Sequence, residues 1–182
     1  LCYLVEIGFK IIDTAIDFCV DWTNDELETI FDQIKKSYEF YITRIDEYGM
    51  ERFHWSFIDE LKNSVKEKKK FYSCGAGIVS LYVKINGDFY ACPSCFDSRM
   101  KLGNIYTGYD IEKINFLKKV DTLNNKCNSC KLFSVCGAKG CLMLNLSSNN
   151  DMSIPNYALC SIEKFMYNFY QSKYSHTEVQ HD

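Results

Sequence analysis

The sequence predicts an α+β fold, in which N-terminal helices precede a small cysteine-rich domain with a β-hairpin and a C-terminal helix. Apolar residues recur at helical spacing over residues 23–49, whereas they alternate over residues 78–85 as in a half-buried strand. Eight of the ten cysteines lie between Cys74 and Cys160. This change in pattern predicts three regions: helices over 1–70, a cysteine-rich domain over 71–171 and a polar tail over 172–182.

The expected elements carry recognisable local signals. Thr23 and Glu26 form a capping box at the start of the first long helix, because each side chain can accept a hydrogen bond from the other residue's backbone N–H. A second helix is predicted around residues 56–69. Asn86-Gly87 predicts the two-residue turn of a hairpin, since both residues tolerate positive φ. Further helices are expected from the N-cap Asp110 to Val120, and from Pro155 to Gln171.

Composition restricts the function classes. The chain has 182 residues, 47% of them hydrophobic, and a formal net charge of −3 spread along its length, which argues against nucleic-acid binding. Charged residues interrupt the apolar stretch 1–22, so no membrane-spanning segment is predicted. Residues 1–22 also lack the basic start and cleavage site of a signal peptide, and the chain begins at Leu1 as if cut from a longer protein. We therefore expect a cytoplasmic protein.

The cysteines predict metal or cluster binding. Because no secretion signal is predicted, we expect a reducing compartment, in which thiols persist. The cysteines are therefore better interpreted as metal ligands than as disulfide partners. Thiolates two residues apart, as in Cys127-x2-Cys130, can reach one centre from a tight turn, and a cubane cluster takes up to four such ligands. The small residues Gly137, Ala138 and Gly140 allow close backbone approach, so their amides can donate hydrogen bonds to sulfur. Cys2 and Cys19 lie on apolar stretches and are expected to be inert core thiols.

At this point the sequence resembles a known family. The order C-x12-G-x4-C, C-x2-C-x5-C-x4-C and a last cysteine is similar to the seven-cysteine signature of the SPASM domain. That domain is the C-terminal auxiliary iron–sulfur region of radical S-adenosylmethionine (SAM) enzymes that modify peptides and proteins. Supporting strings are Cys74-Gly75-Ala76-Gly77, the hairpin ending at Cys92-Pro93, and Leu102-Gly103-Asn104-Ile105. The resemblance covers roughly half of the chain.

The resemblance implies two auxiliary [4Fe–4S] clusters. The first would be held by Cys74, Cys92 and Cys141, and the second by Cys127, Cys130, Cys136 and Cys160. The four-residue spacing before Cys141 departs from the three residues usual in the family. No cysteine lies shortly upstream of Cys74, where some members supply a fourth ligand. Cys95 is one candidate for that ligand; an iron open to a substrate thiolate or small ligand is the alternative, and a free buried thiol is the structural interpretation of Cys95.

The chain lacks the C-x3-C-x2-C loop that binds the SAM-cleaving cluster, so it does not carry that chemistry alone. On the resemblance, residues 1–70 are the remnant of a radical SAM barrel with linker helices, and the implied activity is modification of a ribosomal peptide, with thioether formation as one such reaction. Implied partners are a peptide substrate, an N-terminal radical SAM core or a separate chain that carries it, and a reductant such as ferredoxin or flavodoxin.

Two other functions fit the cysteines less well. A structural zinc module would use Cys92/Cys95 and Cys127/Cys130 as a pair of pairs, but it leaves four cysteines unused. A stand-alone two-cluster electron carrier would not need the N-terminal helices. The aromatic residues Tyr106, Tyr109, Phe116 and Phe133 are expected to shield the metal centres from water.

Overall fold

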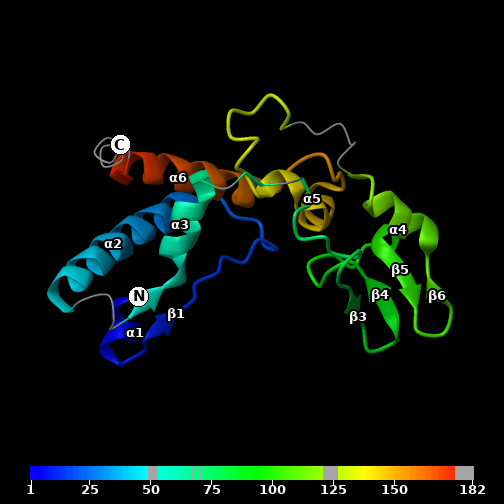
Figure 1. Cartoon of the computed structure of the whole chain (residues 1–182), viewed down its shortest axis with the longest axis horizontal. Helices are drawn as coiled ribbons and strands as arrows, with labels where there is room; N and C mark the ends of the chain where they lie inside the picture. Colours follow the sequence, from blue (N-terminus) through cyan, green and yellow to red (C-terminus); the bar gives the residue numbers. More distant parts are fainter. Residues whose placement is uncertain (49–52, 67, 70, 121–126, 175–182) are drawn as a thin grey trace. The chain divides into compact units, whose positions relative to one another are not determined.

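The protein was analysed as a computed structural model, which describes residues 1–48, 53–66, 68–69, 71–120 and 127–174 (Figure 1). The chain divides into two compact units: residues 1–67 with 164–182, and residues 68–163. The boundary between them near residue 163 lies inside the last helix, α6 (Tyr157–Tyr174). The helices and two small sheets confirm the predicted α+β class.

The first unit contains a βαβ arrangement that the sequence did not predict. Its elements are α1 (Cys2–Glu6), β1 (Ile11–Ile12), α2 (Asn24–Tyr48), β2 (His54–Trp55) and α3 (Ser56–Lys66). β1 and β2 pair in parallel, with Ile12 opposite Trp55. Parallel neighbours need a long crossover connection, which α2 supplies here.

The capping box at the start of α2 is confirmed. The backbone N–H of Thr23 donates to Glu26 Oε2 at 2.9 Å, and the N–H of Glu26 donates to Thr23 Oγ1 at 3.3 Å. These two bonds satisfy donors that a helix N-terminus leaves without intrahelical partners. α2 ends at Tyr48, and the predicted end at Gly49 lies outside the described residues.

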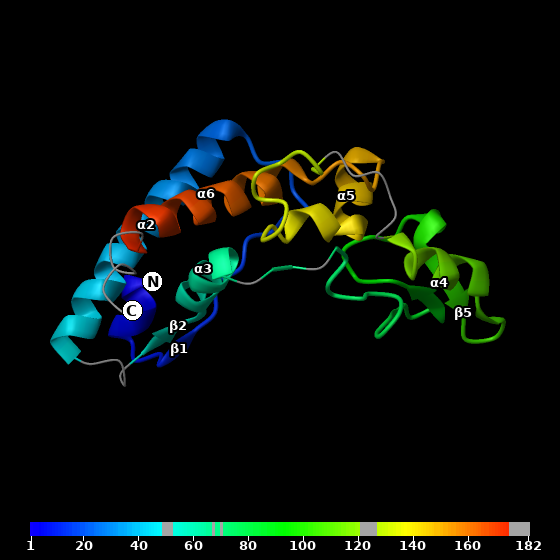
Figure 2. The ribbon, with the colours of Figure 1, turned by 45° about the horizontal axis from the view of Figure 1, so that its top comes forward.

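Aromatic side chains form the core between α2 and the C-terminal half of α6. Phe31 stacks on Phe165 with ring centroids 4.3 Å apart, and Tyr38 meets Phe169 edge to face at 5.1 Å. Figure 2 shows the two helices running side by side. Such ring pairs add to the stabilisation from burial alone. α6 begins two residues later than predicted and extends three residues beyond Gln171.

The second unit contains an antiparallel sheet in the order β3-β4-β5-β6. The predicted hairpin at Asn86-Gly87 is present, with Gly87 at φ +83°, but its strands are short: β3 (Tyr82–Val83) and β4 (Asp88–Tyr90). The sequence did not predict β5 (Lys101–Asn104) and β6 (Gly108–Tyr109). These strands extend the hairpin into a meander (Figure 1).

Short helices complete the second unit. α4 (Ile111–Leu117) begins after its predicted cap Asp110, whose carboxylate accepts from the N–H of Lys113 at 3.1 Å. Two 3-10 turns, η1 (Ser98–Met100) and η3 (Ala138–Gly140), and an unpredicted helix, α5 (Leu142–Asn149), follow in chain order. Sheet and helices share one core; its most buried members are Leu102, Leu117, Leu142, Met143 and Ala91. Among the described residues, no helix has the length and apolarity needed to cross a bilayer.

Truncation of a core leucine tests this packing. Leu102 in β5 is 0% exposed, so Leu102→Ala is expected to lower the free energy of unfolding by about 2–5 kcal/mol, through lost burial and the cavity left behind. The matched control is Ile85→Ala, because Ile85 lies fully exposed beside the hairpin turn and its truncation is expected to change stability by less than about 0.5 kcal/mol. Urea unfolding measures both, and equal losses would contradict the described core.

Candidate metal centre

All eight cysteines from Cys74 to Cys160 belong to the second unit, and the ten cysteines, all within the described residues, form no disulfide with one another. The eight come from loops, turns and one helix end rather than from the sheet. Cys2 and Cys19 belong to the first unit and are exposed, so the prediction that they are core thiols is wrong. The thiols with ligand spacing are therefore collected in one compact part of the chain.

Three cysteines gather around the hydroxyl of Tyr72; we call Cys74, Cys92 and Cys141 the first cysteine group. Burial raises the pKa of Tyr72, and negative charge on Cys74, Cys92 and Cys141 raises it further. Three sulfurs from separate parts of the second unit therefore act electrostatically on the same hydroxyl. The hydroxyl itself donates a short hydrogen bond to the carbonyl of Ala76.

Close backbone packing positions this group. A Cβ atom on Gly140 would lie 2.4 Å from the nitrogen of Tyr72, so only glycine fits there. Tyr72 adopts φ +52°, which turns the chain sharply before Cys74. Gly140 directly precedes Cys141, so the approach of Gly140 to Tyr72 is what brings Cys74 and Cys141 to one place.

Cys95 lies beside the first cysteine group but in a different environment. It is 3% exposed and belongs to the apolar core that also contains Leu102. Burial raises the pKa of its thiol, while a hydrogen bond from the backbone of Asp97 acts in the opposite direction and the charge of Cys92 adds a smaller increase. Burial in apolar surroundings disfavours a thiolate, so the structure favours the buried-thiol interpretation of Cys95.

A second set of thiols surrounds the turns between residues 127 and 141; we call Cys127, Cys130, Cys136 and Cys160 the second cysteine group. The N–H of Cys130 donates to the carbonyl of Cys127 at 2.8 Å, which closes the tight turn expected for this spacing. The N–H of Cys136 donates to Leu132 O at 2.9 Å, in a second turn. Consecutive turns thus present the loop cysteines within a short stretch of chain.

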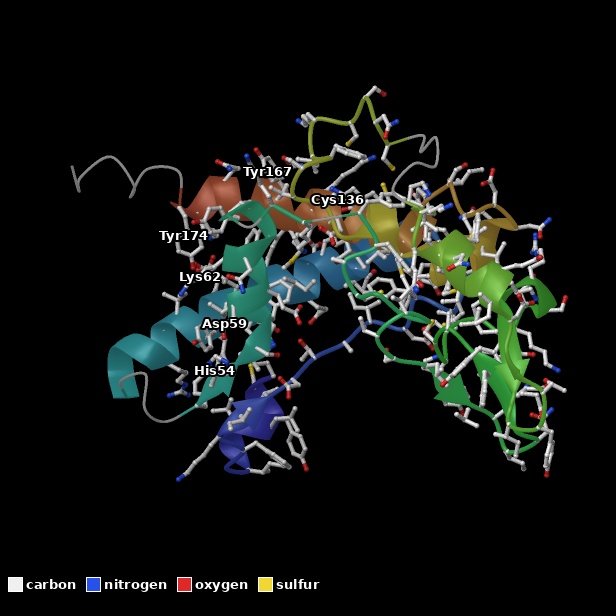
Figure 3. All side chains as sticks on the ribbon, turned by 45° about the vertical axis from the view of Figure 1, so that its right-hand side comes forward. His54, Asp59, Lys62, Cys136, Tyr167 and Tyr174 are labelled. Atoms are coloured by element: carbon white, nitrogen blue, oxygen red, sulfur yellow. The ribbon has the colours of Figure 1, made fainter. Side chains whose placement is uncertain are left out.

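Cys136 links these turns to the start of α6 (Figure 3). Burial raises the pKa of Cys136 to about 11, with a further increase from the carboxylate of Glu163 and a smaller one from Cys160. The backbone amides of Lys139 and Ala138 donate to its sulfur and act in the opposite direction. Of the three small residues expected to donate to sulfur, Ala138 does so to Cys136, and the other donor is Lys139.

The sequence did not predict that the side chain of Lys139 would be buried in this region. Its side chain is buried in the second unit, and its ammonium donates to the carbonyl of Lys69 at 2.9 Å and to that of Phe133. Burial lowers the pKa of Lys139, whereas negative charge on Cys136 and on Cys127 raises it.

The cysteine groups differ from a site for a single metal ion. In the described ranges, no group of three or more His, Cys, Asp or Glu side chains could hold one metal ion. Ligands of a single zinc ion lie about 2.3 Å from it and hence about 4 Å from each other. Ligands of a cubane cluster bind different iron atoms and so lie farther apart. The donors in both groups are thiols alone, and cysteine thiolates are the ligands that iron–sulfur clusters take.

The predicted aromatic shield is wrong for three of its four residues. Tyr106 is 87% exposed, Tyr109 is 56% exposed and Phe116 is also exposed, so they do not cover the thiols. Phe133 is partly buried, and its ring lies 4.3 Å from the ammonium of Lys139. Tyr72 packs beside the first cysteine group instead. Its position two residues before Cys74 is the only sequence signal that could have indicated this role.

No protein-family model matches the chain, and no curated protein matches it in sequence. The similarity to the SPASM family therefore depends on the order of the cysteines and the residues around them.

Adding one methyl group at Gly140 tests the close approach of Gly140 to Tyr72. Gly140→Ala would force the backbone at Tyr72 to move, so we expect unfolding free energy to fall by about 1–3 kcal/mol, as for other overpacked sites. Gly137→Ala is the matched control, since its Cβ would meet only the flexible ends of Glu163 at 2.8 Å and Lys69 at 3.5 Å. Urea unfolding compares them, and an equal or larger loss for Gly137→Ala would contradict the packing described.

Proposed function

We propose that residues 71–171 form an auxiliary iron–sulfur domain of the SPASM type, which holds two [4Fe–4S] clusters as part of a radical SAM enzyme that modifies a ribosomal peptide or protein. The observation that carries the proposal is the agreement between two independent groupings. The family register divides the seven cysteines into two sets. The electrostatic neighbours of Tyr72 are Cys74, Cys92 and Cys141, whereas Cys127, Cys136 and Cys160 are linked through Cys136 and Lys139, which supports the same division for six of the seven.

Each cluster has a proposed ligand set. Cys74, Cys92 and Cys141 hold the first cluster, and Cys127, Cys130, Cys136 and Cys160 hold the second. Burial of Cys95 in the apolar core supports leaving one iron of the first cluster open to a substrate thiolate or a small ligand. The clusters supply electron transfer or a binding point for a substrate cysteine. This chain's own residues position the thiols and exclude water from part of the second group.

The remaining parts of the reaction lie outside this sequence. SAM cleavage requires a C-x3-C-x2-C loop, which we propose is supplied by an N-terminal core or a partner chain. The parallel pair β1 and β2, joined by α2, supports this proposal, because βαβ units are the repeating element of α/β barrels. A peptide substrate, a ferredoxin or flavodoxin as reductant and a cytoplasmic location complete the proposal, with thioether formation as the proposed reaction.

The alternatives remain distinguishable by chemistry. A zinc module built from Cys92/Cys95 and Cys127/Cys130 needs both pairs at one ion. The charge of Cys92 acts on Tyr72 and Cys95, whereas that of Cys127 acts on Lys139, and these different neighbours favour two centres. An electron carrier would hold the same clusters, so metal content does not separate it from the leading proposal; peptide modification in the presence of a radical SAM core does.

Anaerobic reconstitution of the 182-residue chain tests the metal content. We expect about eight irons and about eight sulfides per chain, with the broad visible absorption of [4Fe–4S] clusters. A colourless protein that retains one zinc ion would contradict the proposal.

One ligand substitution tests the assignment of the second cluster. Cys130→Ala is expected to reduce the iron content from about eight to about four per chain and to lower thermal stability, because cluster binding and folding are coupled. Cys19→Ala is the matched control, since Cys19 is exposed and belongs to the first unit. Inductively coupled plasma measurements of iron compare the two variants; unchanged iron in Cys130→Ala would count against this ligand set.

A further inference from the structure

β3 is an edge strand of the antiparallel sheet in the second unit. Among the described residues it pairs with β4 alone, at one border of the order β3-β4-β5-β6 (Figure 1). The N–H of Lys84 donates to Asp88 O at 2.9 Å, so the backbone groups of Lys84 point toward the partner strand. Because these groups alternate in direction along an antiparallel strand, the N–H and carbonyl of Val83 point away from β4. Such unpaired groups are a template for another extended segment.

Aromatic side chains and one cation lie on one face of this edge. Tyr82 and Lys84 are two residues apart and share a face, and Tyr90 is paired opposite Tyr82. The ring of Phe96 lies 5.6 Å from that of Tyr82, and both side chains are exposed. On the other face, Val83 is 49% exposed. Both faces of the edge therefore offer apolar surface beside unpaired backbone groups.

Lys84 gives this edge its charge. Its ammonium lies 5.6 Å from the ring centroid of Tyr90 and 4.6 Å from that of Phe96, and in the part of the chain that the structure describes no carboxylate pairs with it. The nearby carboxylate of Asp88 is paired with Lys101 at 2.6 Å instead. A lysine on an edge strand disfavours a basic strand beside it and favours an acidic residue in the cross-strand position.

The opposite edge of the sheet, β6, differs in backbone and in charge. Gly108 in β6 has φ +78°, a left-handed conformation that departs from an extended strand. The two lysines beside this edge are already engaged: Lys101 pairs with Asp88, and Lys113 donates to the carbonyls of Ser98 and Lys101. An acidic extended segment therefore fits the β3 edge better than the β6 edge.

We propose that the β3 edge binds an extended peptide by antiparallel strand addition, with an acidic residue opposite Lys84 and apolar residues opposite Val83 and Tyr82. Backbone hydrogen bonds to Val83 supply affinity, and the alternating side chains supply specificity. The identification of this peptide with the substrate rests on the proposed function, whereas the binding itself does not. β4 ends two residues before Cys92, so a substrate bound here lies on the hairpin that leads to a proposed ligand of the first cluster.

The probe is a fluorescein-labelled, C-terminally amidated peptide with a central Glu-Val-Leu segment flanked by threonines. Fluorescence anisotropy with the full 182-residue chain should give a dissociation constant below about 1 mM. A peptide with lysine in place of glutamate should bind about threefold more weakly or worse, through loss of the ion pair. N-methylation of the valine should weaken binding about tenfold or more, because it removes a backbone donor. Absent binding, or equal binding of all three peptides, overturns the inference.

Two proline variants locate the binding edge. Val83→Pro removes an N–H that points away from β4, a position where edge strands tolerate proline, so binding should weaken about tenfold or more while the hairpin persists. Tyr109→Pro is the matched control on β6. The N–H of Asp110 donates to Leu102 O at 2.7 Å, so by the same alternation the N–H of Tyr109 points to the outer side of β6. Its loss should leave binding unchanged, and equal weakening in both variants overturns the inference.

A charge exchange decides the matter if Val83→Pro does not fold, as judged by urea unfolding. Lys84→Glu should bind the lysine peptide more tightly than the glutamate peptide, because the cross-strand pair is restored with its charges reversed. An unchanged preference for the glutamate peptide overturns the inference. A dimer that sedimentation detects, that Val83→Pro dissociates and that excludes the probe overturns it as well, since a second copy then occupies the edge.

Iron content separates this inference from the proposed function. A chain that takes up about eight irons but binds no probe overturns the inference and leaves the proposed function intact. A chain that binds the probe at the β3 edge but takes up no iron–sulfur cluster supports the inference and overturns the proposed function.

Discussion

The cysteine-rich unit depends on one close backbone contact, the approach of Gly140 to Tyr72. No side chain fits between them, because a Cβ on Gly140 would lie 2.4 Å from the Tyr72 nitrogen. The contact is extended by Lys69, whose N–H donates to Ser134 O at 2.9 Å and whose carbonyl accepts from Lys139. Lys69 and Tyr72 are thereby held against Ser134, Lys139 and Gly140, which lie far from them in the sequence. These residues flank Cys74, Cys136 and Cys141 in the sequence.

The local signals in the sequence predicted much of the fold. The Thr23 capping box, the Asn86-Gly87 turn and the Asp110 cap all act through hydrogen bonds or backbone preferences within a few residues, so the sequence displays them directly. The unpredicted elements depend on distant partners. β1 is only two residues long and exists because residues 54–55 pair with it, and β5 with β6 contains two glycines and little alternation.

The site was predictable in part for the same reason. The family resemblance implied the two sets of thiols, and the electrostatic neighbours of Tyr72 and Cys136 agree with that division for Cys74, Cys92, Cys141, Cys136 and Cys160. The burial of Lys139 was not expected, because a lysine between small residues is usually a solvated surface residue. Its burial involves a segment distant in the sequence, since its ammonium donates to the carbonyl of Lys69. The exposure of Tyr106 and Tyr109 was missed because apolar composition alone does not distinguish a core from an exposed hairpin.

Protection of cysteines from alkylation tests the central proposal most directly. In the iron-loaded chain, mass spectrometry after iodoacetamide treatment should find Cys2 and Cys19 labelled and seven cysteines protected: Cys74, Cys92, Cys127, Cys130, Cys136, Cys141 and Cys160. Removal of the iron by a chelator should make those seven reactive, since the thiolate ligands are released. Equal labelling of the seven cysteines with and without iron would contradict the account.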